Sequence, residues 1–227
     1  MHMEIKAVIT GDIVHSRRVG DIQLLLAGLK STINDISNHL KIDIPFEIYR
    51  GDSFQMLVEI PELVAEIAVL IRSGLRNSTP MSITDNNTMS IENLWDTRVS
   101  IGIGRVEFPA PKIVESSGEA FKLSGLQLDD MKNSADRIRM ISTWDDLNEQ
   151  FAVITALGDS IIRRWTYHSS QAAYRYLLYK ETQKEISEKL GISQPAVHNR
   201  LNIGNIDVIE KMFAYLKKTI KSRTDGK

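Results

Sequence analysis

Along residues 1–143, called here the front of the chain, apolar and polar positions follow two different periods, and each period predicts a different kind of secondary structure. Short β-branched or alternating runs predict strands, and apolar residues repeated every three or four positions predict helices. The expected strands are 4–10, 46–50, 53–60, 98–104 and 136–142, and the expected helices are 21–40, 61–75 and 118–132. Asp21 is the expected N-cap of the first helix.

The first six of these elements follow the order β-α-β-β-α-β, which is typical of ferredoxin-like folds. In such a sheet the third strand lies beside the first and antiparallel to it. The end of the first strand therefore meets the hairpin turn, which the sequence places at Gly51-Asp52 as a two-residue connection. Because Asp12 directly follows the first strand, we expect the Asp12 and Asp52 carboxylates to lie close together.

The back of the chain has a helical pattern throughout. A long amphipathic helix is expected at 145–165, and the segment 182–201 (TQKEISEKLGISQPAVHNRL) predicts two short helices joined by a turn at Gly191. This is a helix-turn-helix pattern, so the fold class expected is α+β, a ferredoxin-like or palm domain followed by an all-α helix-turn-helix domain. We place a palm-like domain at 1–143, a connecting helix at 144–166 and the helix-turn-helix domain at 167–227. The polar stretch 76–95 is expected to be a surface insertion.

The second helix of this motif presents side chains suited to reading DNA bases or gripping phosphate. These expected DNA contacts are Ser193, Gln194, Ala196, His198, Asn199 and Arg200. The charge distribution agrees, since residues 1–160 carry 15 Lys/Arg and 23 Asp/Glu, whereas residues 161–227 carry 13 and 6. DNA is therefore the expected partner, and a homodimer would match the usual use of such motifs. The alternative is a helix-turn-helix that serves only structure or protein binding.

Composition limits the possible bonds, metal sites and cellular location of the protein. The chain contains no cysteine, which excludes disulfides and thiolate metal sites. The N-terminus has no signal-peptide pattern, and no run of the chain reaches the ~18 apolar residues of a membrane span. We therefore expect a cytoplasmic protein with no membrane partner.

The paired aspartates are the strongest candidate for chemistry. Two converging carboxylates repel unless a cation or proton lies between them, and oxygen donors without cysteine match Mg²⁺ or Mn²⁺. The hydroxyl of Ser16 and the guanidiniums of Arg17 and Arg18 follow closely and suit a nucleotide's phosphates. The alternative is structural: Asp12 caps a turn and Asp52 fills the Gly-Asp turn. The residues alone leave both interpretations open.

The segments ITGDIVHSRR, RGDSFQML, RVSIGIG and SSGEAFKLSG, in this order, resemble the SatD family of bacterial proteins over essentially the whole chain. More distantly, the same order is similar to class III nucleotide cyclases. That resemblance implies two metal ions held by Asp12, Asp52 and the backbone carbonyl of Ile13. Gly51 and Lys122 join the expected nucleotide or phosphate contacts.

The cyclase resemblance fails in the helix that follows Gly118. The family's Asn and Arg, four residues apart, correspond to Lys122 and Leu126, so cyclisation is disfavoured. The leading hypothesis is a DNA-binding regulator whose palm-like domain senses a metal-bound nucleotide. The alternatives are a two-metal nucleotide-processing enzyme with a localising or assembling tail, and a DNA-binding protein whose palm-like domain only dimerises.

Overall fold

The fold is described here from a computed structural model, which describes residues 4–16, 19–49, 51–80, 90–108 and 113–226. Arg17 and Arg18, two of the expected phosphate contacts, lie outside the described residues. So do residue 50 and the central part, 81–89, of the expected insertion.

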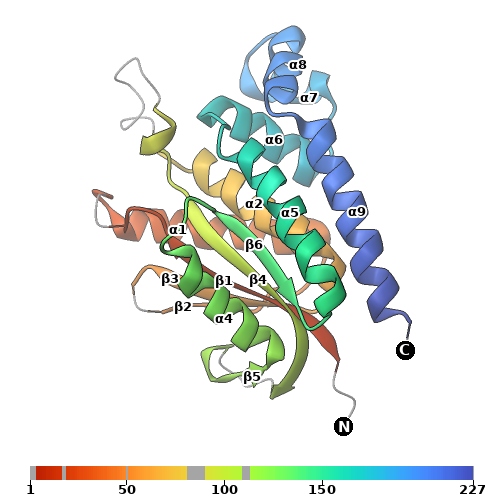
Figure 1. The fold of residues 1–227 in the computed structure, drawn as a ribbon. Helices are drawn as coiled ribbons and strands as arrows, with labels where there is room; N and C mark the ends of the chain where they lie inside the picture. Colours follow the sequence, from red (N-terminus) through yellow and green to blue (C-terminus); the bar gives the residue numbers. More distant parts are fainter. Residues whose placement is uncertain (1–3, 17–18, 50, 81–89, 109–112, 227) are drawn as a thin grey trace.

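A single mixed sheet forms the centre of the front of the chain (Figure 1). Its strands are β1 (Ile5–Ile13), β2 (Phe46–Tyr49), β3 (Ser53–Val58), β4 (Thr97–Phe108), β5 (Ser117–Gly118) and β6 (Ile138–Ser142). The order is β2-β3-β1-β4-β5. Strand β5 pairs with the end of β4, at Val106 and Phe108, whereas β6 pairs with the earlier residues Val99–Ile103 of β4. Strand β1 is antiparallel to both β3 and β4, whereas β6 is parallel to β4. The first four strands therefore have the ferredoxin-like order that the sequence predicted.

Helices cover both faces of this sheet, and the helices after residue 166 form the tail of the chain (Figure 1). They are α1 (Ile22–Leu40), α2 (Val64–Asn77), α4 (Glu119–Met131), α5 (Asp145–Ile162), α6 (Tyr167–Tyr179), α7 (Gln183–Leu190), α8 (Gln194–Ile203) and α9 (Ile206–Thr224). Short 3-10 helices are η2 (Pro61–Leu63), η3 (Ile91–Asn93) and η4 (Ile113–Glu115). The α+β fold class is confirmed: a palm-like sheet domain is followed by helices only.

Local sequence signals explain where these elements begin and turn. The Asp21 carboxylate accepts a hydrogen bond from Leu24 N at 3.0 Å and so caps α1, as expected. The β2–β3 hairpin differs from the expectation in one detail. Its last pair is Tyr49 with Ser53, so the turn spans three residues rather than two. Gly51 has φ 82°, a left-handed conformation that favours glycine at this turn.

Helix α4 packs unusually close to the sheet because a glycine faces it. A Cβ added to Gly102 would lie 2.3 Å from the Ala120 carbonyl oxygen, so the sheet needs glycine at this position. A small apolar cluster, which includes Val8, Leu57 and Phe121, fills the space under α4. The main core lies on the opposite face, against α1 and α2.

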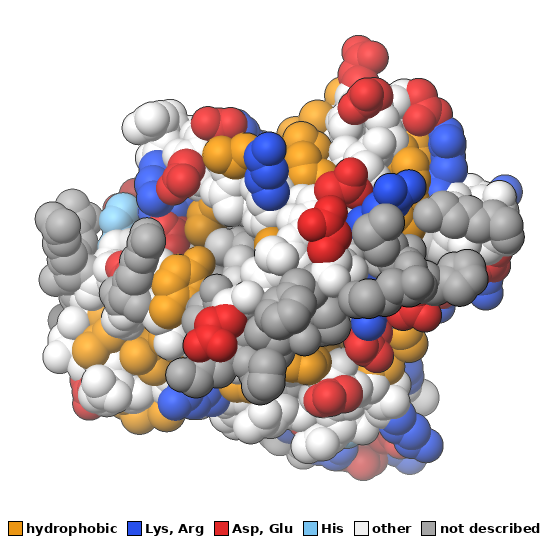
Figure 2. Space-filling view, turned by 90° about the horizontal axis from the view of Figure 1, so that it is seen from below, with side chains coloured by type: hydrophobic (Ala, Val, Ile, Leu, Met, Phe, Trp, Pro, Cys, Tyr) orange, Lys and Arg blue, Asp and Glu red, His pale blue; other side chains and the backbone are white. Residues whose placement is uncertain are grey.

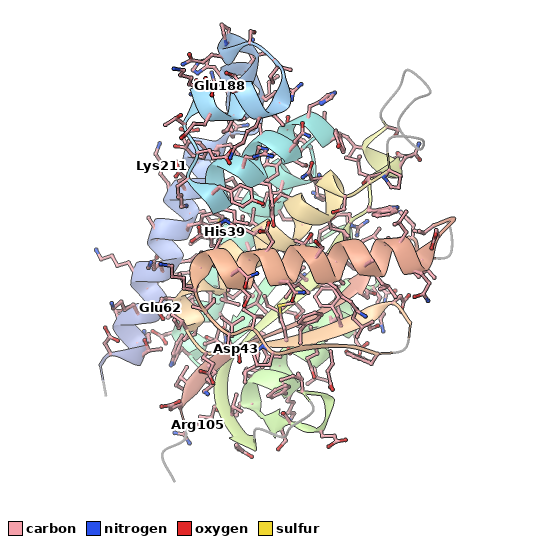
Figure 3. All side chains as sticks on the ribbon, turned by 180° about the vertical axis from the view of Figure 1, so that it is seen from behind. His39, Asp43, Glu62, Arg105, Glu188 and Lys211 are labelled. Atoms are coloured by element: carbon pink, nitrogen blue, oxygen red, sulfur yellow. The ribbon has the colours of Figure 1, made fainter. Side chains whose placement is uncertain are left out.

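The tail helices pack directly on the front of the chain. Helix α6 lies along α2, and α9 contacts η2 and α5. Buried Tyr174 and Leu177 of α6 belong to the same apolar core as Leu70 of α2. From behind, α1 crosses the sheet, and His39 near its end lies toward the tail helices (Figure 3), where its ring contacts Tyr179 edge-on. The boundaries at 143 and 166 stay a prediction, and one continuous core runs across them.

The two tail helices expected within 182–201 are present and capped as the sequence indicates. Thr182 and Glu185 form a reciprocal capping box at the start of α7. Gly191 ends α7 with φ 63°, and the Ser193 hydroxyl accepts from Ala196 N at the start of α8. In the described part of the chain, no helix is long and apolar enough to span a membrane.

Candidate functional site

The end of β1 brings the two predicted aspartates together. Asp12 lies opposite Ser53 on β3, and Ile13 N donates a 2.9 Å hydrogen bond to the backbone oxygen of Asp52. The backbones of the two aspartates therefore lie side by side, as the topology predicts, whereas the expected proximity of their carboxylates stays a prediction. The predicted roles of Asp12, Ile13 and Asp52 as metal ligands stay a prediction.

The Asp12 side chain is engaged by an arginine that the sequence interpretation had not assigned to the site. Arg98, directly across the ladder on β4, donates to both carboxylate oxygens of Asp12, at 2.8 and 2.9 Å. This is the bidentate geometry of a strong guanidinium–carboxylate pair. Asp12 is only 8% exposed, so its negative charge is neutralised within the protein.

Asp52 has a more open and more weakly bonded environment. The Ser16 hydroxyl donates to one carboxylate oxygen at 2.7 Å, and the Ser53 hydroxyl approaches the other at 3.5 Å. Ser16 thus lies at the predicted site, as a partner of Asp52. Gly51 is exposed, and an added Cβ would meet no atom within 4 Å. The backbone there is open to a ligand.

A pocket of about 360 Å³ separates this strand end from α4. Asp12 and Lys122 both line it, so the structure places two of the predicted site residues together. Leu126 also lines the pocket and is 58% exposed. Its apolar side chain has no group that can stabilise charge, which agrees with the departure from the cyclase pattern.

The donor set does not fit a two-cation centre in this arrangement. The Arg98 guanidinium bonds both Asp12 oxygens, and its positive charge would repel a cation at the same carboxylate. Among the described residues, no group of three or more His, Cys, Asp or Glu side chains is placed to hold a metal ion. Mg²⁺ or Mn²⁺ binding therefore stays a prediction.

Next to this site lies a buried cluster of charges that the sequence did not reveal. Asp96, just before β4, accepts from Arg72 Nε and Nη2 at 2.9 and 2.7 Å and from Arg76 Nη2 at 2.6 Å. Asp159 of α5 accepts from Arg72 Nη1 at 2.6 Å. Burial alone would raise the pKa of Asp96, but the two guanidiniums outweigh it and hold that pKa well below its usual range.

The charge cluster connects the sheet end to the tail. On one side, Val14 N donates to the Asp96 backbone oxygen at 2.9 Å, directly after β1. On the other side, Arg76 Nη1 donates to the carbonyl oxygens of Ile162 and Trp165, both at 2.8 Å. The buried Trp165 indole then donates to the Gly204 oxygen at 2.8 Å, at the end of α8.

The predicted DNA contacts lie on α8 but do not form one uniform surface. Gln194, His198 and Asn199 are exposed, and Ser193 is exposed with its hydroxyl engaged in the cap. Ala196 and Arg200 are partly buried.

Two of these α8 side chains have partners within the protein. The Arg200 guanidinium lies 3.5 Å from Gln171 Oε1 of α6, so it turns partly toward the tail core. His198 Nε2 lies 2.8 Å from Asn202 Nδ2. DNA binding by these residues stays a prediction.

The positive charge of the tail is spread rather than concentrated on α8. Helix α9 carries exposed Lys211, Lys217, Lys218, Lys221 and Arg223. The face seen from below, opposite the end of the molecule where α8 lies, also carries interspersed acidic and basic side chains among its described residues (Figure 2). The excess of basic residues therefore gives a weaker argument for a DNA-binding face than the sequence alone indicated.

The fold and the site together define a palm-like α+β protein with charged residues at one end of its sheet and a helical tail. No protein-family model and no curated protein matches the chain. Similar solved structures include two of a bacterial light-regulated adenylyl cyclase. The first has a TM-score of 0.43 and 10% identity over 62% of this chain and 77% of that one. The second has a TM-score of 0.40 and 9% identity over 61% of this chain and 43% of that one.

A third similar structure is the catalytic core of a rhodopsin–guanylyl cyclase with converted specificity in complex with ATPαS. Its TM-score is 0.39, with 18% identity over 66% of this chain and 81% of that one. At such identities the likeness concerns the general fold and adds no argument about the site.

Proposed function

We propose that the protein is a cytoplasmic, nucleotide-responsive regulator. Its palm-like front binds a phosphate-bearing nucleotide in the pocket of Asp12 and Lys122, and its tail binds DNA through α8. The nucleotide changes the affinity for DNA. Membership of the SatD family, on the motifs ITGDIVHSRR and RGDSFQML, belongs to this proposal, as does pairing of two copies on DNA.

The observation that carries the proposal is the hydrogen-bonded connection between the sheet end and α8. Asp96 is bonded through its backbone to Val14, two residues after Asp12, and through its side chain to Arg76. Arg76 in turn holds the end of α5, and Trp165 holds the end of α8. Ligands couple when both act on one element with two arrangements, and this connection is a candidate for that element.

The charges of the pocket support a phosphate ligand. In the part of the chain that the structure describes, the exposed Lys122 ammonium makes no ion pair and no side-chain hydrogen bond. It faces the same space as Asp12, whose charge Arg98 already neutralises. A ligand there would meet a net positive field, which favours phosphate.

The form of α8 supports DNA as the partner of the tail. Ser193 begins the helix, and the next turns expose amide side chains at Gln194 and Asn199. Amides of this kind can form paired hydrogen bonds with adenine in the major groove. The packing of α6 and α7 against α8 holds this face in place.

The decisive experiment measures DNA affinity with and without nucleotides. Fluorescence anisotropy with duplexes selected for binding from a random 30-base-pair pool gives the affinity and its salt dependence. The titration is repeated with ATP and GTP, each in EDTA, in Mg²⁺ and in Mn²⁺, and the nucleotides are then analysed for products. A change of DNA affinity without turnover supports the regulator. Turnover of the nucleotide supports the enzyme alternative, and absence of DNA binding contradicts the proposal.

Three variants separate the parts of the proposal. Gln194→Ala with Asn199→Ala should weaken DNA binding about tenfold or more, because each amide–base pair contributes about 1–3 kcal/mol. Lys217→Ala on α9 is the matched exposed control and should change affinity little. Trp165→Phe removes the donor to Gly204 and should reduce the effect of nucleotide on DNA affinity while each ligand still binds. An unchanged nucleotide effect in Trp165→Phe would refute the proposed connection.

A further inference from the structure

A second cavity, of about 520 Å³, lies beside the end of β1 and shares no lining residue with the pocket of Asp12 and Lys122. Its volume falls within the roughly 300–1,000 Å³ usual for small-molecule sites. Apolar side chains form much of its wall and polar ones enter from the surrounding loops. The residues that matter here are Val19, Leu94 and Trp95 on the apolar side, and His15, Arg137 and the exposed Glu92 on the polar side.

Arg137 is held rigidly by its backbone while its side chain stays available. Its N–H donates to Asp159 Oδ2 at 2.9 Å, and its carbonyl oxygen accepts from Val99 N at 2.8 Å. Within the described ranges, the one hydrogen bond of its guanidinium is a long contact of 3.5 Å to the Asp136 carbonyl oxygen. A fixed backbone with an unengaged guanidinium is a preorganised anion-binding group.

The surroundings leave the positive charge of Arg137 without a partner of its own. Asp96 and Asp159, which offset it at a distance, are both already bound to Arg72. No carboxylate of the described residues lies within ion-pair distance of the Arg137 guanidinium; Glu92, which also lines the cavity, is exposed to solvent, and nearby Arg98 is paired with Asp12. Burial lowers the pKa of Arg137, and Arg72 and Arg98 lower it further, while Asp96 and Asp159 offset part of this. An anion entering the cavity would give the Arg137 guanidinium a direct partner.

We propose that this cavity binds a phosphate monoester of mononucleotide size without a divalent cation. Arg137 binds the phosphate, and the apolar wall beside Trp95 accepts the base. The guanidinium matches two phosphate oxygens at once, which gives a strong charge-assisted contact. A cation is disfavoured because the Arg137 guanidinium, which has no carboxylate partner among the described residues, already places a positive charge at the cavity wall. The site is separate from the pocket of the proposed function and does not depend on DNA binding.

His15 contributes to the shape of the cavity through its backbone. It has φ 55°, a left-handed conformation that is uncommon for a residue other than glycine. Such conformations persist where surrounding contacts hold the backbone in place, and they cluster at active sites and ligand sites. This observation is independent of the charges and lies at the same cavity.

Isothermal titration calorimetry in EDTA tests the proposal, with AMP, GMP, CMP and UMP, ribose 5-phosphate and inorganic phosphate as ligands. We expect saturable binding of at least one nucleoside monophosphate, and weaker binding of ribose 5-phosphate because it lacks the base. Arg137→Ala should weaken that binding about tenfold or more, and Arg137→Lys should weaken it less. Arg139→Ala is the matched control, because Arg139 is paired with Asp136 and does not line the cavity.

Thermal unfolding of each variant shows whether it is folded, and Arg137→Lys keeps the test valid if Arg137→Ala unfolds. Equal loss in Arg137→Ala and Arg139→Ala would overturn the proposal, as would failure of every phosphate to bind in EDTA. Binding of ribose 5-phosphate as tight as that of the nucleotides would overturn the role of the apolar wall. The phosphate binding that Arg137→Ala removes should persist in Lys122→Ala. Binding that is lost in Lys122→Ala and kept in Arg137→Ala would belong to the pocket of the proposed function and would overturn this site.

Discussion

Replacing Asp96 by Asn tests the buried charge cluster most directly. The carboxylate accepts four hydrogen bonds, two on each oxygen: Arg72 Nε and Thr97 N on Oδ1, and Arg72 Nη2 and Arg76 Nη2 on Oδ2. An Asn amide has one oxygen and one NH₂ group. In either orientation its NH₂ would therefore face two donors, and the negative charge would be lost.

The expected cost is large because the cations left behind are buried. Arg72 is fully buried and would retain Asp159 as its one carboxylate partner among the described residues, while Arg76 would retain no carboxylate partner there. The Arg76 Nε is already buried without a hydrogen-bond partner among the described atoms. Breaking a buried ion pair by removing one partner costs about 3–5 kcal/mol. For a chain of this length that lowers Tm by about 6–20 °C.

Urea unfolding followed by far-UV circular dichroism measures the change in the free energy of unfolding. Asp129→Asn is the matched control, since Asp129 pairs with Lys132 on an exposed helix face. Exposed pairs contribute about 0–1 kcal/mol, so the control should unfold close to wild type. A loss below about 1 kcal/mol for Asp96→Asn, or equal losses in both variants, would refute the assignment of the cluster as a major stabilising element.

Three further outcomes follow from the structure. The pKa of Asp96 is lower in the folded state than the roughly 3.9 of an unfolded Asp, so its contribution to the free energy of unfolding is present above that pH and is lost on further acidification. Urea titrations at decreasing pH should therefore show a smaller fall in the free energy of unfolding for Asp96→Asn than for wild type. Gly102→Ala should lower Tm strongly, because its Cβ would lie 2.3 Å from the Ala120 oxygen; a Tm equal to wild type would contradict the close α4 packing. Thr182→Ala removes the capping box with Glu185, and hydrogen exchange should show faster opening of α7 at a cost of about 1 kcal/mol.

The sequence was sufficient for the order of the first four strands and for placing the backbones of Asp12 and Asp52 side by side. Both follow from local patterns, because the strand and helix periods define the element order and the ferredoxin-like topology then places β3 beside β1. The caps at Asp21, Thr182 and Ser193 were equally predictable, since capping depends on residues within a few positions of each other.

The sequence could not predict contacts between distant charges. Arg98 was part of a recognised strand, but its bond to Asp12 depends on which residues face each other across the ladder. Arg72 looked like an ordinary helix cation. A signal was nevertheless present, because Val69, Leu70 and Leu75 make α2 apolar around most of its circumference. A helix of that kind is buried, so its charged residues need partners inside the protein.

Arg72 and its neighbours also bear on the expected division of the chain into domains. Helix α2 supplies Arg72 and Arg76, and the Arg76 guanidinium binds carbonyl oxygens at the end of α5. On its other side α2 packs against α6, where a Cβ on Gly74 would lie 2.8 Å from the Tyr174 ring. The front of the chain and the tail therefore share both an apolar core and a buried charge cluster.

We accordingly expect the chain to unfold as one cooperative unit. Far-UV circular dichroism reports all helices, and the fluorescence of Trp165 in a variant with Trp95→Phe and Trp144→Phe reports the junction between front and tail. The two probes should give coincident urea transitions, which is the standard test of two-state behaviour. Tail helices that melt before the junction, as an earlier far-UV transition, would instead show two domains that fold separately. In that case a nucleotide bound at the sheet end would have no rigid connection through which to act on α8.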